Sequence, residues 1–117
     1  MKINQKAKNN VEVFELSGEL DFHTSPELRD RLLKVLEKPM ARILVNLKKI
    51  TYIDSSGLAT FVETFQKIQR GGGKLVLAEL APNVRSVFEI AKLERVFALA
   101  NSEPEGFTLL ENESSRK

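Results

Sequence analysis

The chain has 117 residues, of which 42% are hydrophobic, and this size and composition predict one compact domain with a modest core. It contains no cysteine, which excludes disulfides and thiolate metal ligands and favours a cytoplasmic location. The net charge is only +2, and Lys and Arg are scattered among Asp and Glu, so nucleic acid is not an expected partner.

The first predicted element is a β-hairpin. Residues 1–8 have the pattern of a weak strand, and "VEVFELS" (residues 11–17) alternates apolar and acidic side chains as a strand with one wet face does. Asn9 and Asn10 lie between the two and tolerate the positive backbone angles of a tight turn. We therefore expect the two strands to pair antiparallel.

A capped helix is predicted over residues 25–37. Apolar side chains recur there at helical spacing: Leu28, Leu32, Val35 and Leu36. Thr24 and Glu27 have the spacing of a capping box, and Pro26 suits the first turn of a helix. Thr24 is therefore the expected N-cap.

Strands and helices alternate through the rest of the chain. "RILVNLKKI" (residues 42–50) is apolar at nearly every position, as in a central strand that is buried on both faces. A second helix follows, with an apolar stripe that comprises Leu58, Phe61, Val62, Phe65 and Ile68. The glycines at 71–73 must end this helix.

The last third of the chain repeats this alternation. Residues 74–80 and 95–100 are predicted strands, and residues 82–93 are a predicted helix. One face of that helix is expected to carry Val84, Val87, Phe88 and Ala91. A short C-terminal helix is expected to carry Phe107, Leu109 and Leu110.

The resulting order, ββαβαβαβ, predicts an α/β fold. Its sheet should be mixed and mostly parallel, with the hairpin as an antiparallel edge. We expect one domain over residues 1–112 and a polar, frayed tail over residues 113–117. No apolar run approaches the ~20 residues that cross a bilayer, and "MKINQKAKNN" lacks the apolar stretch of a secretory signal, so direct membrane insertion is not expected.

Enzymatic chemistry finds little support in the motifs. Ser55, His23 and an aspartate at 21 or 54 are the right groups for serine catalysis, but Ile53 stands where a nucleophile elbow needs glycine. "IQRGGGKL" lacks the first glycine and the Ser or Thr of a phosphate-binding loop. A single histidine and scattered carboxylates predict no metal site. We expect neither an enzyme nor a cofactor.

The stretch "DSSG" (residues 54–57) opens the second helix and has two interpretations. Asp54, Ser55 or Ser56 can cap the helix by accepting hydrogen bonds from its first N–H groups. One cap needs only one side chain, however, and a phosphate at this bare helix start would be held by backbone N–H groups and the helix dipole. The residues alone place the structural cap ahead of a phosphorylation site.

A resemblance changes that order. "GELDFHT" (residues 18–24), "ILVNLKKITYIDSSGLATFV" (43–62) and "GGKLVLAELAPNVRSVFEIAKLERVF" (72–97) together resemble bacterial anti-sigma factor antagonists of the STAS domain family (sulfate transporter and anti-sigma factor antagonist). The resemblance implies a single STAS domain with helices packed largely on one side of the sheet. It also implies partner switching: the unphosphorylated protein binds an anti-sigma factor that is a serine kinase of the histidine-kinase-like ATPase fold, and thereby releases its target.

The resemblance also implies the site residues. Ser55 is the expected phosphoacceptor, and Asp54, Ser56 and Gly57 form its surroundings, with Gly57 keeping the first turn open to the kinase. Partner binding falls to Asp21, which has no expected structural duty, together with Thr24 and Leu58. A metal-dependent serine phosphatase would reverse the modification.

Two other functions fit the same family. One is a cytoplasmic STAS accessory subunit of a membrane transporter, and the other is a scaffold of a signalling assembly. The intact "DSSG" motif in this chain favours the antagonist over both.

Overall fold

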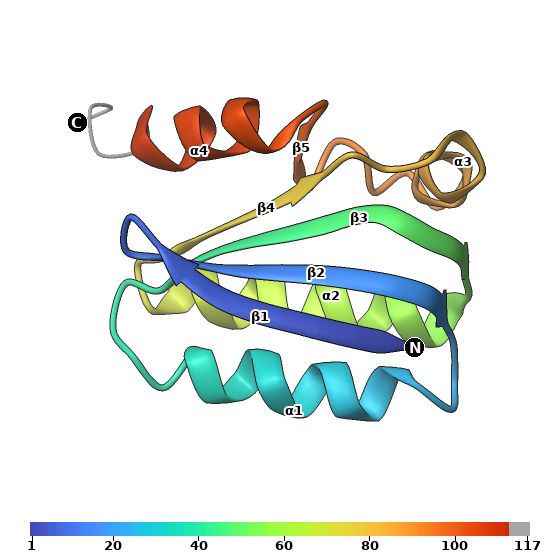
Figure 1. Ribbon diagram of the computed structural model, residues 1–117, viewed down its shortest axis with the longest axis horizontal. Coiled ribbons are helices and arrows are strands. Elements are labelled where there is room, and N and C mark those ends of the chain that lie inside the picture. The colour runs from blue at the N-terminus through green and yellow to red at the C-terminus, as the bar shows by residue number, and fades with distance from the viewer. Residues whose placement is uncertain (113–117) are drawn as a thin grey trace.

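The computed structural model describes residues 1–112, and the predicted polar tail, residues 113–117, lies outside the described residues. In the described part, five strands form one sheet: β1 (Lys2–Lys8), β2 (Val11–Leu20), β3 (Arg42–Ile53), β4 (Lys74–Ala78) and β5 (Ala98–Ala100). Four helices connect or follow them: α1 (Ser25–Val35), α2 (Ser55–Arg70), α3 (Pro82–Ile90) and α4 (Glu103–Asn112) (Figure 1). The predicted α/β fold and order of elements are confirmed.

The strands lie side by side in chain order, from β1 to β5. β1 pairs antiparallel with β2, and the other neighbours pair in parallel. Asn9 and Asn10 form the hairpin turn with φ angles of 55° and 65°, as predicted. β3 is the central strand, also as predicted, and its burial on both faces explains its nearly continuous apolar sequence.

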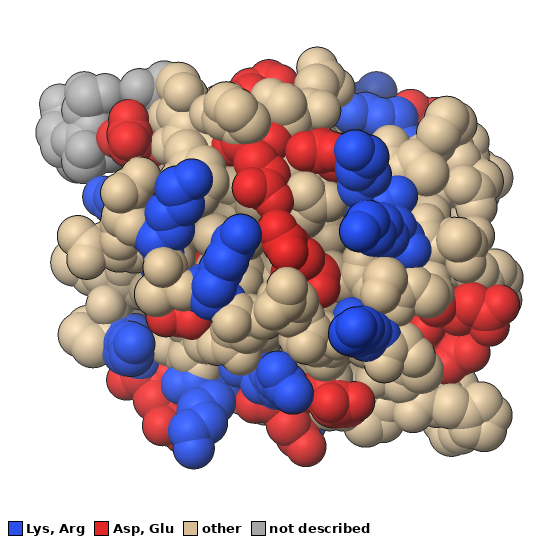
Figure 2. Space-filling view, in the orientation of Figure 1, with Lys and Arg blue, Asp and Glu red and all other residues tan. Residues whose placement is uncertain are grey.

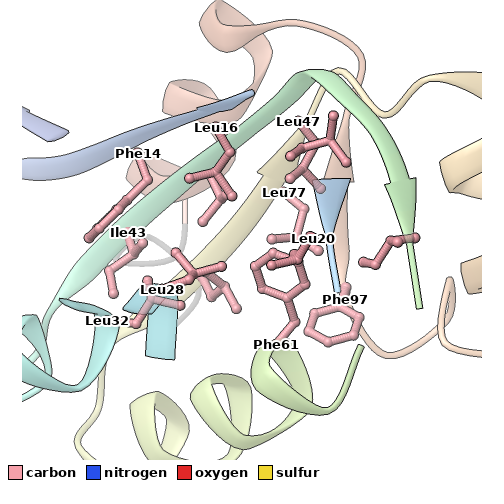
Figure 3. Packing of buried hydrophobic residues seen from close by; sticks show 14 of the residues in the cluster. Phe14, Leu16, Leu20, Leu28, Leu32, Ile43, Leu47, Phe61, Leu77 and Phe97 are labelled. Carbon is pink, nitrogen blue, oxygen red and sulfur yellow. The ribbon is translucent and has the colours of Figure 1, made fainter. Parts of the chain in front are cut away.

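Apolar side chains form one cluster on each face of the sheet. The larger cluster joins β2 and β3 to α1, α2 and α3, and includes Phe14, Leu28, Phe61 and Phe88 (Figure 3). The smaller cluster lies under α4, where Leu110 meets Leu44 and Val76. Figure 1 shows α1 and α2 on one side of the sheet and α4 on the other. Val84 and Phe88 of α3 belong to the same cluster as the buried residues of α1 and α2, so three of the four described helices pack on one side.

Element ends differ from the predictions where local hydrogen bonds intervene. α1 ends at Val35 instead of residue 37, because the N–H groups of Glu37 and Lys38 donate to carbonyls only three residues back. β5 begins at Ala98 instead of residue 95, because the preceding residues turn and the N–H of Phe97 donates to the carbonyl of Leu93.

Two further differences concern α3 and the strands beside it. α3 ends at Ile90, so the predicted inward-facing Ala91 is only its C-cap and is exposed. β4 ends at Ala78, before the residues at 79–80 that the pattern had included. β2 and β3 instead run three residues past their predicted ends, because they continue to pair with each other in parallel as far as Leu20 and Ile53.

Candidate functional site

The two sequence motifs meet where β2 and β3 end. Leu20 pairs with Ile53, so the residues that follow the two strands emerge at the same end of the sheet. The N–H of Asp54 then donates to the carbonyl of Leu20 at 3.2 Å. The motifs "GELD" and "DSSG" therefore lie side by side at this end of the sheet.

Asp54 is the N-cap of α2. Its Oδ1 accepts hydrogen bonds from the N–H groups of Ser56 (2.9 Å) and Gly57 (3.2 Å). Its Oδ2 accepts a third hydrogen bond, from the N–H of Phe22 at 3.2 Å. Of the three polar residues that could have capped the helix, the aspartate alone does so.

The hydroxyls of Ser55 and Ser56 consequently do not cap the helix. Ser55 is exposed, and its Oγ makes no hydrogen bond within the part of the chain that the structure describes. Ser56 is half-buried, and its carbonyl accepts a hydrogen bond from the hydroxyl of Thr60. Ser55 therefore presents an accessible oxygen to an incoming protein.

Asp54 limits the donors that this helix start offers to a phosphate. The backbone N–H groups of Ser56 and Gly57 already donate to its carboxylate. A phosphate on Ser55 would have to compete with a carboxylate for these donors.

The loop between β2 and α1 depends on Asp21 and Thr24. Oδ1 of Asp21 accepts hydrogen bonds from the N–H groups of His23 (2.9 Å) and Thr24 (3.1 Å). Partial burial of the Asp21 carboxyl favours its neutral form, but these hydrogen bonds outweigh that effect and hold its pKa below the ordinary value. The expectation that this charge has no structural duty is wrong, because the carboxylate orders the loop.

Thr24 does not form the predicted capping box. Its hydroxyl accepts a hydrogen bond from the N–H of Asp21 and donates to the carbonyl of Glu19, each at 2.9 Å. The side chain thus turns back towards β2, and no side chain caps α1 at this residue. Thr24 is half-buried, and its hydroxyl joins the loop to the end of β2.

Gly57 is buried against the sheet. A Cβ built on it would lie 2.8 Å from both Ile53 Cγ1 and Leu20 Cγ, which is closer than real side chains approach. The missing side chain would point inward, so the glycine serves helix packing and not access for a kinase. Leu58 is half-buried and packs against the larger core cluster.

A catalytic relay is not assembled here. Asp21 and Asp54 direct their carboxylates at backbone N–H groups, and the exposed imidazole of His23 makes an edge contact with the ring of Phe22. Among residues 1–112, no group of three or more His, Asp or Glu side chains could hold a metal ion. Within the same range, none of the helices combines the length and the apolar character needed to cross a bilayer.

Comparison with known proteins identifies the family. The sequence profile of the STAS domain matches residues 2–106. The chain belongs to the STAS domain family. The anti-sigma-B factor antagonist of Bacillus subtilis (strain 168) is 32% identical over 102 residues, which cover 86% of this STAS chain and 93% of the relative.

Solved structures show the same STAS fold. A Thermotoga maritima protein described as a candidate anti-sigma factor antagonist has a TM-score of 0.88 at 20% identity, and the match covers 93% of this chain and 94% of that one. The Bacillus cell fate determinant SpoIIAA, solved in its phosphorylated form, has a TM-score of 0.69 at 23% identity, with 88% and 95% covered.

Two exposed aromatic residues of this STAS domain escaped the sequence analysis. Phe22 is 71% exposed in the loop after β2, and Tyr52 is 49% exposed on β3, two residues before the capping aspartate. In the sequence, Phe22 stands out as an aromatic side chain between two polar residues, whereas Tyr52 is followed by the apolar Ile53 and gives no such signal. Both lie at the end of the sheet that carries Ser55.

Charged side chains away from the site form local pairs. Arg29 on α1 and Lys67 on α2 both donate to the carboxylate of Glu63, at 2.7 to 2.8 Å. The face seen in Figure 2 carries a band of acidic side chains with Lys and Arg on both sides, so the charges on that face are mixed.

Proposed function

We propose that this STAS domain is an anti-sigma factor antagonist that works by phosphorylation-dependent partner switching. One observation carries the proposal: Ser55 offers an exposed hydroxyl, free of hydrogen bonds in residues 1–112, at a helix start that Asp54 already caps. The cap does not use the hydroxyl of Ser55, so Ser55 is available for modification without loss of the helix.

Relatives support the proposal. The Bacillus subtilis relative is named an anti-sigma-B factor antagonist, and SpoIIAA, a protein of the same fold, exists in a phosphorylated form. By extension, the partner is an anti-sigma factor with serine kinase activity and the histidine-kinase-like ATPase fold. A metal-dependent serine phosphatase restores the hydroxyl, and the exchange takes place in the cytoplasm without catalysis by this chain.

The physical effect of the switch is electrostatic. A phosphate adds about −1.5 to −2 charges at pH 7 next to the carboxylate of Asp54. On binding, this charge has to be desolvated against a partner surface shaped for a neutral hydroxyl, and two N–H groups of the helix start already donate to Asp54. A penalty of about 3 to 4 kcal/mol lowers the affinity by two to three orders of magnitude.

The test is phosphorylation followed by titration. The kinase is captured with the purified chain, identified by mass spectrometry and incubated with the chain and ATP; phosphosite mapping should find Ser55. Ser55→Ala should bind the kinase persistently, whereas Ser55→Asp should bind weakly and melt near the wild-type temperature. Ser56→Ala is the matched control and should still accept phosphate.

Two outcomes contradict the proposal. One is phosphate found only on Ser56, and the other is equal affinity of the phosphorylated and unphosphorylated forms for the kinase. Either would favour a transporter subunit or a signalling scaffold, the two alternatives that do not require the switch.

A further inference from the structure

Phe22 is one of the exposed apolar side chains among the described residues, and unlike Met40 it adjoins the Ser55 site. Single exposed hydrophobic residues are common, so 71% exposure of this ring is not in itself informative. Met40 (68%) and Ile90 (82%) are similarly exposed, at the turn before β3 and at the end of α3. Met40 lies at the opposite end of β3 from the Ser55 site.

The loop around Phe22 is fixed on both sides of the ring. Before it, the N–H of Asp21 donates to the hydroxyl of Thr24, which in turn donates to the carbonyl of Glu19. After it, the N–H of His23 donates to the carboxylate of Asp21. The loop therefore holds the backbone of Phe22 in one place before any partner arrives, which reduces the entropy lost on binding.

A hydrogen bond joins Phe22 to the residue that precedes Ser55. The N–H of Phe22 donates to Oδ2 of Asp54, and Asp54 immediately precedes Ser55. The same carboxylate caps α2 through its other oxygen. The backbone of Phe22 and that of Ser55 are thus held close together through Asp54, so a protein that covers Ser55 lies beside the loop that carries the ring.

We propose that Phe22 is the apolar anchor by which this chain docks on its kinase. This proposal rests on the proposed function. It adds an apolar contact to the polar groups of the site, which are the Ser55 hydroxyl and the carboxylates of Asp21 and Asp54. The kinase should present an apolar pocket beside the place that receives Ser55, because aromatic anchors that fill such pockets carry much of the affinity of protein interfaces. Phe22 then supplies affinity, and phosphorylation of Ser55 prevents its ring from entering the pocket of the kinase.

The experiment compares two equally exposed apolar side chains. Isothermal titration measures the affinity of the kinase identified above for wild type, Phe22→Ala and Met40→Ala. Phe22→Ala should lose about 10- to 100-fold in affinity. Met40→Ala should stay within about twofold of wild type, and both variants should melt near the wild-type temperature because neither side chain belongs to a core cluster.

Ionic strength separates the ring from the charge. Burial of an apolar ring is insensitive to salt, whereas exposed charge repulsion is screened. The Phe22→Ala loss should therefore persist at high salt, while the part of the Ser55→Asp penalty that comes from repulsion between exposed charges should shrink. A Phe22→Leu variant should recover part of the lost affinity, because it restores apolar area.

The possible outcomes test the role of Phe22 separately from the proposed antagonist function. A wild-type chain that does not bind the kinase overturns both proposals. Binding by wild type with Phe22→Ala within twofold overturns the anchor alone, as does an equal loss in Met40→Ala. Self-association of wild type that Phe22→Ala abolishes, with unchanged kinase affinity, would assign the ring to a second copy of the chain and also overturn the proposal.

Discussion

The carboxylate of Asp54 accepts a hydrogen bond from the N–H of Phe22, a residue 32 positions earlier in the chain, at 3.2 Å. This contact ties the loop after β2 to the start of α2, while the other oxygen of the same side chain caps the helix. One carboxylate therefore sets both the position of the Ser55 hydroxyl and that of the neighbouring loop.

The two tasks of Asp54 can be separated by substitution. Asp54→Ala should cost about 0.5 to 2 kcal/mol of unfolding free energy through loss of the cap. Asp54→Ser keeps a capping oxygen but is too short to reach Phe22, so it should retain most of that stability and still weaken kinase binding. Urea unfolding and titration check the two effects; equal stability of the alanine variant and wild type would rule out the cap.

Asp21 is expected to affect both the fold and the interface. Asp21→Ala removes the acceptor for the N–H groups of His23 and Thr24, so the melting temperature should fall and kinase binding should weaken with it. Asp21→Asn keeps an acceptor oxygen and should melt closer to wild type. A melting temperature unchanged in Asp21→Ala would show that the loop is ordered without this carboxylate.

Gly57 has no room for a side chain. Gly57→Ala should destabilise the chain by about 1 to 3 kcal/mol through overpacking against Leu20 and Ile53, although alanine favours helices. Gly71→Ala is the matched control, because a Cβ there meets only ordinary contacts at 3.8 Å and should be neutral or mildly stabilising. Chemical denaturation measures both, and equal stabilities would refute the close approach of α2 to the sheet.

The pairing of α1 with α2 should depend on pH. Hydrogen bonds from Arg29 and Lys67 lower the pKa of Glu63 from 4.5 to about 2. Because the folded pKa is depressed, the associated stability is present above about pH 4.5 and is lost as the pH falls towards 2. Melting temperatures of wild type and Glu63→Gln should differ most above pH 5 and converge in acid. A constant difference across this range would contradict the pairing.

The core prediction contrasts two phenylalanines of α2. Phe61 is fully buried, with its ring centroid 6.4 Å from that of Phe88, so Phe61→Ala should cost about 3 to 5 kcal/mol. Phe65 is half-buried against Phe97, and its truncation should cost less. Unfolding free energies from urea titration measure the two losses. A larger loss on truncation of Phe65 than on truncation of Phe61 would mean that α2 faces the sheet through Phe65.

Patterns of local burial were sufficient to predict most of the fold. The nearly unbroken apolar run of β3 indicates a strand covered on both faces, and the paired Asn9 and Asn10 indicate the hairpin turn. Both features are visible in sequence because burial period and turn conformation depend on neighbouring residues. The motif around Ser55 could be located for the same reason, as a polar break between a buried strand and an amphipathic helix.

Tertiary structure alone decided how the site residues are used. The pairing of Leu20 with Ile53 brings two loops together, and only then can Asp54 reach Phe22 and leave the Ser55 hydroxyl without a capping task. The same geometry turns Thr24 back to β2, away from the helix that its spacing had predicted it would cap. A local pattern names the groups able to form a hydrogen bond, but the partner that each group takes depends on which distant segment the folded sheet places beside it.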